Sequence, residues 1–228
     1  MGTGDSTCFL YMINAIFFNT PIETNFIGHQ MAEVYRDRVY DPILGGKKGL
    51  TILDIGANVG VTSYYFSQFA KDVYAVEPSL QHFDILTRMI AFNKLQNVHP
   101  IKKAIYIKKG TYPFGGTAVN KTMRSLHAAI WDEGKPDEEV EAITIKDLIE
   151  ENKIKKVDFM KLDVEGSETE ILSSTAFKEV ADMIGAIVVE RHSWSGRHEN
   201  QLNEALKSVG FEVSGIPNAA DLLLAKRW

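Results

Sequence analysis

Asp54, Gly56, Asn58 and Gly60 alternate directly after an apolar run, and Glu77 ends the next apolar run of the chain. A buried strand, a tight glycine turn and the start of a helix form the nucleotide-binding corner of an open parallel sheet. In such sheets an acid about 20 residues further on binds a pair of ribose hydroxyls. The spacing therefore predicts a ribose-containing cofactor, with Glu77 on its ribose.

The identity of the residue at position 58 separates two classes of cofactor. Dinucleotide sites use G-x-G-x-x-G, whose middle glycine lets the backbone approach a pyrophosphate. Asn58 occupies that position, and the carboxylate of Asp54 would repel a phosphate at short range. S-adenosylmethionine carries an ammonium, a sulfonium and a ribose but no phosphate, so the motif favours this cofactor. The alternative is a strand–turn–helix joint whose glycines serve geometry alone.

Carboxylates also follow the later apolar runs, at Asp163 and Glu190. Ligands of open α/β sheets lie outside the carboxyl ends of the strands, so we expect both acids at the same site. Methyl transfer to a hydroxyl requires in-line positioning and benefits from a general base near neutral pH, which suits His192 by type. Asp163 and Glu165 are rival bases. We therefore predict His192, Asp163 and Glu190 as catalytic residues that converge on one cavity.

The same side chains could instead bind a divalent metal ion, because carboxylates with an imidazole suit several metals. Asp163, Glu190 and His192 could ligate it. No compact ligand motif supports this, so the sequence predicts no metal.

Hydrophobic periodicity predicts strands that alternate with helices, and hence a parallel α/β sheet. The expected strands are 50–54, 72–76, 98–107, 157–162, 186–189, 211–213 and 222–225. Helices are expected over 61–70, after Ser79, after Thr144 with a capping box, after Ser167 with a capping box to Glu170, and before Gly210. The closing pair of strands predicts one antiparallel strand near the edge of the sheet.

Composition is that of an ordinary globular chain of 228 residues, with 45% hydrophobic and 24% charged residues. The net charge of −5 argues against a nucleic-acid partner. The single cysteine, Cys8, permits no intrachain disulfide and indicates a cytoplasmic location. The apolar stretch 8–18 is too short to span a bilayer, which takes about 20 residues, so no membrane span is expected.

We expect residues 1–48 to form a helical N-terminal lead-in that packs on the core, and residues 49–228 to form the catalytic domain. Segment 111–137 is irregular and rich in glycine. Insertions at such places often cover a substrate and are also often plain hairpins.

The sequence resembles the FkbM-type methyltransferases, a family that uses S-adenosylmethionine. The matching stretches are LDIGANVG at 53–60, VEPS at 76–79 and FMKLDVEGSE at 159–168, with a looser match at VVERH, 188–192. The resemblance implies a Rossmann-like class I methyltransferase fold, with a seven-stranded, mostly parallel sheet and helices on both faces. It also implies O-methylation, in relatives often of sugar or polyketide hydroxyls. The cofactor-binding residues predicted from motif and resemblance are Asp54, Gly56, Asn58, Gly60, Glu77, Pro78 and Asp163.

These observations predict an O-methyltransferase acting on a sugar, a glycan or another small molecule. Two alternatives stay open: a methyltransferase acting on RNA ribose or on protein, and a non-catalytic cofactor-binding module. The intact Asp54, Gly56, Gly60 and Glu77 count against the second alternative. The sequence names neither the acceptor nor the oligomeric state.

Overall fold

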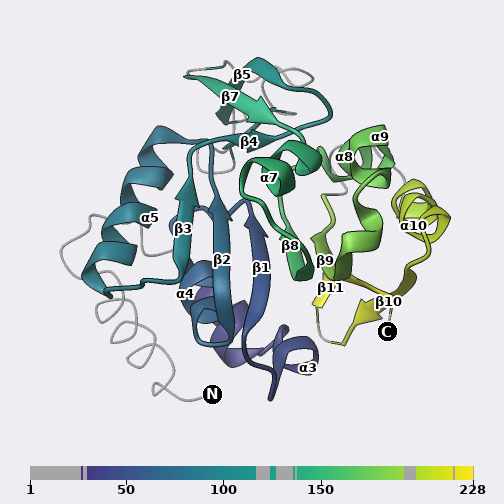
Figure 1. The fold of residues 1–228 in the computed structure, drawn as a ribbon, viewed down its shortest axis with the longest axis horizontal. Helices are drawn as coiled ribbons and strands as arrows, with labels where there is room; N and C mark the ends of the chain where they lie inside the picture. The colour runs from purple at the N-terminus through teal and green to yellow at the C-terminus, as the bar shows by residue number, and fades with distance from the viewer. Residues whose placement is uncertain are drawn as a thin grey trace.

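The computed structural model describes residues 27, 30–116, 124–126, 136, 138–192, 199–217 and 219–227. Its centre is a seven-stranded sheet with the order β10-β11-β9-β8-β1-β2-β3. The strands are β1 (Leu50–Ile55), β2 (Ala70–Val76), β3 (Val98–Ile101), β8 (Val157–Leu162), β9 (Ile184–Glu190), β10 (Glu212–Ile216) and β11 (Ala219–Lys226). Figure 1 shows β1, β2 and β3 side by side, with the C-terminal strands beyond β8.

The direction of the strands confirms the predicted sheet. β1 pairs in parallel with β2 and β8, β2 with β3, and β8 with β9. β11 runs antiparallel to both of its neighbours, β9 and β10. β11 is therefore the one reversed strand, next to the edge formed by β10, because a short turn joins the two strands directly.

Helices cover both faces of the sheet, as expected. They are η1 (Ala32–Arg36), α3 (Asp41–Leu44), α4 (Val61–Ser67), α5 (Leu80–Phe92), α7 (Ile145–Glu151), α8 (Glu168–Ser173), α9 (Thr175–Lys178), η2 (Ala181–Met183) and α10 (Glu199–Ser208). Phe66 of α4 and Leu86 of α5 pack in one core cluster with Ile52 of β1. Leu148 of α7 and Leu206 of α10 pack in the other cluster, on the opposite face.

A second, four-stranded sheet has the order β4-β7-β5-β6. It contains β4 (Ala104–Ile105), β5 (Gly110–Gly116), β6 (Arg124–Ser125) and β7 (Glu138–Ile143). In Figure 1 this sheet lies at the top of the view, beyond the carboxyl ends of β1, β2 and β3. It therefore adds a wall to the edge where ligands bind in open α/β sheets.

Residues before β1 pack on the main core. Val34 of η1 is buried, and so are Tyr40 and Leu44, in the cluster that contains Phe66 and Phe159. The Tyr40 ring meets both phenylalanine rings edge to face. The described part of the segment before β1 therefore packs against the main core. The division at residue 48 stays a prediction, and residues 1–26, with Cys8 and the apolar stretch 8–18, lie outside the described residues.

Three local predictions were wrong. The strand expected over 98–107 is two strands, because the chain leaves the main sheet after Ile101 and pairs β4 with β7. The helix expected over 61–70 ends at Ser67, and Ala70 already pairs with Leu50. The side chain of Ser167 makes no capping hydrogen bond; instead Glu168 accepts from the backbone N–H groups of Val164 and Gly166. The capping box at Thr144 is confirmed.

Candidate active site

A pocket opens at the carboxyl ends of β1, β2 and β8. It is lined by Ile55, Gly56, Asn58, Val76, Glu77, Pro78, His82, Lys103, Ala104, Ile105, Phe114, Leu126, Asp163, Val164, Glu165 and Ser167. Five of the seven predicted cofactor-binding residues are among them. The other two, Asp54 and Gly60, are not among the lining residues.

The loop after β1 requires glycine at position 56. Gly56 has φ +78°, and a Cβ atom there would lie 1.7 Å from the carbonyl oxygen of Asp163. The loops after β1 and β8 can approach this closely only without a side chain. Asn58 also has a positive φ, +52°, which asparagine tolerates better than most residues. Glycine at position 56 thus allows the two loops of the pocket to pack directly against each other.

Glu77 connects the loop after β1 with the loop after β2. Its Oε2 accepts from Asn58 N–H at 2.9 Å, and its Oε1 accepts from Ser79 N–H at 2.8 Å. Burial raises the pKa of Glu77 to about 7, although these two hydrogen bonds oppose the shift. Each oxygen keeps a second lone pair for a ligand hydroxyl.

Asp54 is fully buried and faces the start of α4 rather than the pocket. Its Oδ2 accepts from Thr62 Oγ1 at 2.8 Å and from Ser63 Oγ. Burial raises its pKa, and the charge of Lys161 acts in the opposite direction. Asp54 therefore fixes the strand–helix corner. Its Oδ1 has no hydrogen-bond partner within the described part of the chain.

Lys161 is a buried cation among carboxylates, and sequence reasoning missed it as a site residue. Its ammonium lies 2.8 Å from Asp163 Oδ2 and 3.4 Å from the Gly56 carbonyl oxygen. Burial acts to lower its pKa, but the charges of Asp163, Asp54 and Glu190 outweigh burial and raise it. Lys161 stays charged as a result. The alternation of β8 could have located it, because residue 161 shares a face with Phe159.

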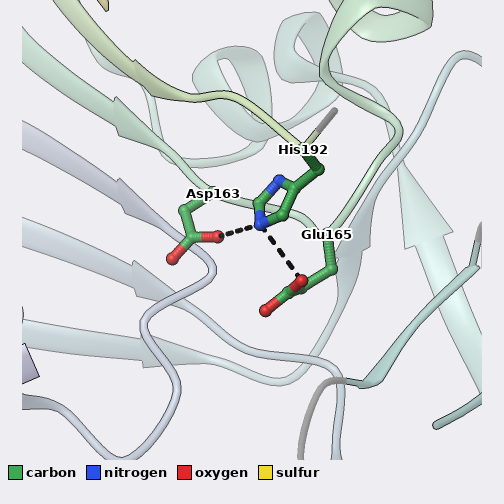
Figure 2. A group of neighbouring side chains, drawn as sticks. All are labelled: Asp163, Glu165 and His192. Atoms are coloured by element: carbon green, nitrogen blue, oxygen red, sulfur yellow. Dashed lines mark ion pairs between the residues drawn. The ribbon is translucent and has the colours of Figure 1, made fainter. Parts of the chain in front are cut away.

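His192 is the centre of a second charged group (Figure 2). Its Nε2 lies 3.1 Å from Glu165 Oε2, and 3.9 Å from both Asp163 Oδ1 and Glu190 Oε1. Its Nδ1 lies 2.9 Å from Glu168 Oε1. The structure thus brings the three predicted catalytic residues together and adds two acids. Of the three, however, only Asp163 lines the cofactor pocket, and Glu190 lines a separate cavity. Glu165 was foreseen only as a rival base, and Glu168 was not foreseen.

The electrostatics of this group are strongly coupled. Burial acts to lower the pKa of His192, but hydrogen bonds to Glu165 and Glu168 outweigh it and raise the pKa to about 11. The charge of Asp163, followed by burial, raises the pKa of Glu190 to about 9. Burial acts to raise the pKa of Asp163, but Lys161 and His192 lower it. In this state Asp163 is a carboxylate and His192 an imidazolium at neutral pH.

Residues 54–213, well over half of the chain, match the profile of the methyltransferase FkbM domain. The chain therefore belongs to the FkbM methyltransferase family and uses S-adenosylmethionine as its cofactor. It is similar to methyltransferase sdnD of Sordaria araneosa, with 27% identity over 241 residues, 90% of this chain and 91% of that protein.

Solved structures show the same fold. A SAM-dependent methyltransferase of Aquifex aeolicus has a TM-score of 0.50 at 14% identity, with 90% of this chain and 97% of that chain covered. A Streptococcus mutans protein solved in complex with SAH has a TM-score of 0.51 at 13% identity, with 85% and 96% covered. These likenesses confirm the Rossmann-like class I fold.

The pocket fits this cofactor on its own chemistry. Asn58 lines the pocket, and its Oδ1 atom is buried and has no hydrogen-bond partner among the described residues. Buried polar atoms of this kind normally bond to a ligand or to water. Ile105, Phe114 and Leu126 supply an apolar wall that suits an adenine ring. Among the described residues, no helix is both long and apolar enough to cross a membrane.

Proposed function

We propose that this methyltransferase acts on a hydroxyl oxygen of a sugar, a glycan or another small molecule. The observation that carries this proposal is that Asp163, which lines the cofactor pocket, and Glu190 each lie 3.9 Å from His192 Nε2. When bound, S-adenosylmethionine would supply an electrophilic methyl group to the acceptor oxygen, with S-adenosylhomocysteine as the leaving group. A hydroxyl acceptor also releases a proton, and this group of side chains is suited to receive it.

We propose that cofactor binding is divided among the residues of the pocket wall. Glu77 accepts from the ribose hydroxyls with its free lone pairs, and Pro78 and Asn58 lie beside it. Asp163 places negative charge at the other end, where it attracts the cationic groups of the cofactor. Gly56, Gly60 and Asp54 shape the loop that carries these contacts.

Catalysis in this proposal belongs to Asp163, Glu190 and His192. Lys161 orients the Asp163 carboxylate from one side, and His192 stands on the other side. Glu168 holds the His192 ring by its Nδ1, so Nε2 points toward the carboxylates. The arrangement orients an acceptor hydroxyl and gives its proton a path away from the reacting oxygen.

The experiment is methyl transfer from [methyl-³H]-S-adenosylmethionine to panels of sugars, oligosaccharides, small phenols and alcohols, RNA and protein. We expect label in a sugar or small-molecule hydroxyl, as an ether stable to mild base. Label only in RNA or protein would replace this acceptor class with the alternative one. Cofactor binding without transfer to any panel would support a non-catalytic binding module instead.

The role of the three side chains is tested on the same acceptor. Replacement of the true proton acceptor should reduce kcat by about 10²–10⁴-fold. The cofactor Kd should stay nearly unchanged for Glu190 or His192, whereas replacement of Asp163 should weaken cofactor binding as well. The variants are Asp163→Asn, Glu190→Gln and His192→Gln, with Glu150→Gln on the exposed side of α7 as the matched control. Full turnover in all three variants would remove this group from the chemistry.

We also propose a cytoplasmic location, for which the single cysteine of the sequence is the support. Subcellular fractionation with a tagged chain tests it.

A further inference from the structure

Three potential metal ligands converge beside the cofactor pocket. They are Asp163 Oδ1, Glu165 Oε2 and His192 Nε2, which all lie within 4.8 Å of one another. Figure 2 shows the imidazole between the two carboxylates, with Nε2 directed at both. Asp163 and Glu165 also line the pocket. Two of the three potential ligands thus belong to the wall of the cofactor pocket, and His192 lies directly behind them.

Their spacing is near that of a coordination sphere. Bonds of about 2.1 Å to a six-coordinate ion place neighbouring ligands about 3 Å apart and opposite ligands about 4.2 Å apart. The Nε2–Glu165 distance is 3.1 Å and the Nε2–Asp163 distance is 3.9 Å. Shifts of a few tenths of an ångström at side-chain ends would place one ion among all three.

The ring of His192 is oriented by a carboxylate on one ring nitrogen, as is usual for metal-binding histidines. Glu168 Oε1 lies 2.9 Å from Nδ1, and the same carboxylate accepts from the backbone N–H groups of Val164 and Gly166. An anchored carboxylate keeps a proton on Nδ1, so a metal ion would displace only the Nε2 proton of the imidazolium and take that lone pair. Three electron-pair donors then face one another.

The surroundings are rich in acidic groups and include an unsatisfied polar atom. Lys161 and His192 interact electrostatically with five acids, which are Asp54, Asp163, Glu165, Glu168 and Glu190. The Tyr40 hydroxyl is fully buried, interacts electrostatically with Asp163 and Glu190, and has no hydrogen-bond partner within the described residues. An orphaned buried hydroxyl indicates water or an ion that the protein atoms alone do not supply.

We propose that Asp163, Glu165 and His192 bind one divalent cation of Mn²⁺ type at the edge of the cofactor pocket. Two carboxylates with one imidazole match the mixed oxygen and nitrogen preference of such ions. Three protein ligands leave open positions for oxygen atoms of the acceptor. This proposal replaces the expectation of no metal. It also differs from the alternative ligand set named from the sequence, because Glu165 takes the place of Glu190.

The role of the cation in the reaction rests on the proposed function. A cation that binds the acceptor hydroxyl lowers the pKa of that hydroxyl and holds it in place. Glu190 lies 3.9 Å from His192 Nε2 and is not one of the three proposed ligands, so the hydroxyl proton would pass to a water molecule on another open position. An acceptor with two adjacent oxygens, such as a sugar diol, would fill two open positions.

The test measures Mn²⁺ binding to the full chain without acceptor, by calorimetry and by the loss of the free Mn²⁺ electron paramagnetic resonance signal. We expect saturable binding of one ion. Glu165→Gln and His192→Gln should each weaken it by at least about tenfold, while Glu150→Gln should bind as the parent does. Circular dichroism and S-adenosylmethionine binding check that each variant is folded.

Absence of saturable one-to-one binding, or binding that neither ligand variant weakens, would overturn the metal site. The readout does not depend on turnover, so the two proposals fail separately. Binding of Mn²⁺ in a protein that methylates no hydroxyl would leave the site intact and refute the acceptor class. Full hydroxyl methylation in the presence of a chelator would remove the cation from the reaction.

Discussion

Replacement of Glu77 by alanine tests the cofactor assignment most directly. The carboxylate accepts one backbone N–H on each oxygen, from Asn58 and from Ser79. Its two remaining lone pairs are available to the ribose hydroxyls. A hydrogen bond to a charged group contributes about 1.5–3 kcal/mol, and 1.4 kcal/mol corresponds to a tenfold change in affinity. Loss of one such bond predicts at least about tenfold weaker cofactor binding, and loss of both about a hundredfold.

The same substitution removes the bridge between two loops. The N–H groups of Asn58 and Ser79 would each lose a charged partner, which costs about 1–3 kcal/mol when water does not replace it. We therefore expect a lower denaturation midpoint as well as a weaker Kd. Glu77→Gln separates the two effects, because its amide oxygen still accepts one loop N–H. It should be more stable than the alanine variant and still bind the cofactor less well than the parent.

The assay is isothermal titration with S-adenosylmethionine and with its demethylated product, at a temperature where circular dichroism shows both variants folded. Glu150→Ala, an exposed carboxylate on α7, is the matched control and should keep the parent Kd. A folded Glu77→Ala protein with unchanged Kd would refute the reasoning, since the ribose would then lie elsewhere.

Four further outcomes follow from the structure. Cofactor affinity should be about tenfold weaker at pH 6 than at pH 8, because the pKa of Glu77 is about 7. Only the ionised carboxylate, which predominates above that pH, accepts both ribose hydrogen bonds fully. A cofactor Kd that does not change with pH would contradict this prediction. Gly56→Ala should lose cofactor binding and melt earlier, because its Cβ would lie 1.7 Å from a carbonyl oxygen; parent-like melting would show that the loops are not this close. Lys161→Met should lower the free energy of unfolding in urea by about 3–5 kcal/mol, because it strips buried acids of their cation; a loss below 1 kcal/mol would mean that water reaches them. Thr144→Ala should cost about 1 kcal/mol in the same assay without changing the cofactor Kd, because it removes only the cap of α7.

The sequence by itself determined the strand–glycine–helix corner and the acid that follows β2. Alternating apolar runs and glycine turns are local features, so β1, β2, β8 and β9 could be located without a structure. The reversed β11 also followed from local information, because a strand after a short turn must run back beside its partner. The family-typical stretch around Asp163 pointed to the same class of enzyme.

Only the tertiary structure decided which acidic side chains line the pocket and which stabilise the loops around it. Asp54 and Glu77 both follow the pattern of strand-tip acids, yet Asp54 turns to Thr62 and Ser63 while Glu77 lines the pocket. No local pattern could decide this, because the direction of a side chain at a strand end depends on the loop that packs over it. The break between β3 and β4 has the same origin, since β4 pairs with β7, nearly forty residues away in sequence.

The group around His192 shows the same division. The sequence placed Asp163, Glu190 and His192 at strand ends, and adjacency of β8 and β9 brought them together. The positions of Glu165 and Glu168 depend on contacts between the segment after β8 and the chain after β9, which are 24 residues apart for the Glu168–His192 pair. Charge, burial and protonation at such a site are properties of the packed arrangement, because each group's pKa is set by neighbours that only the fold supplies.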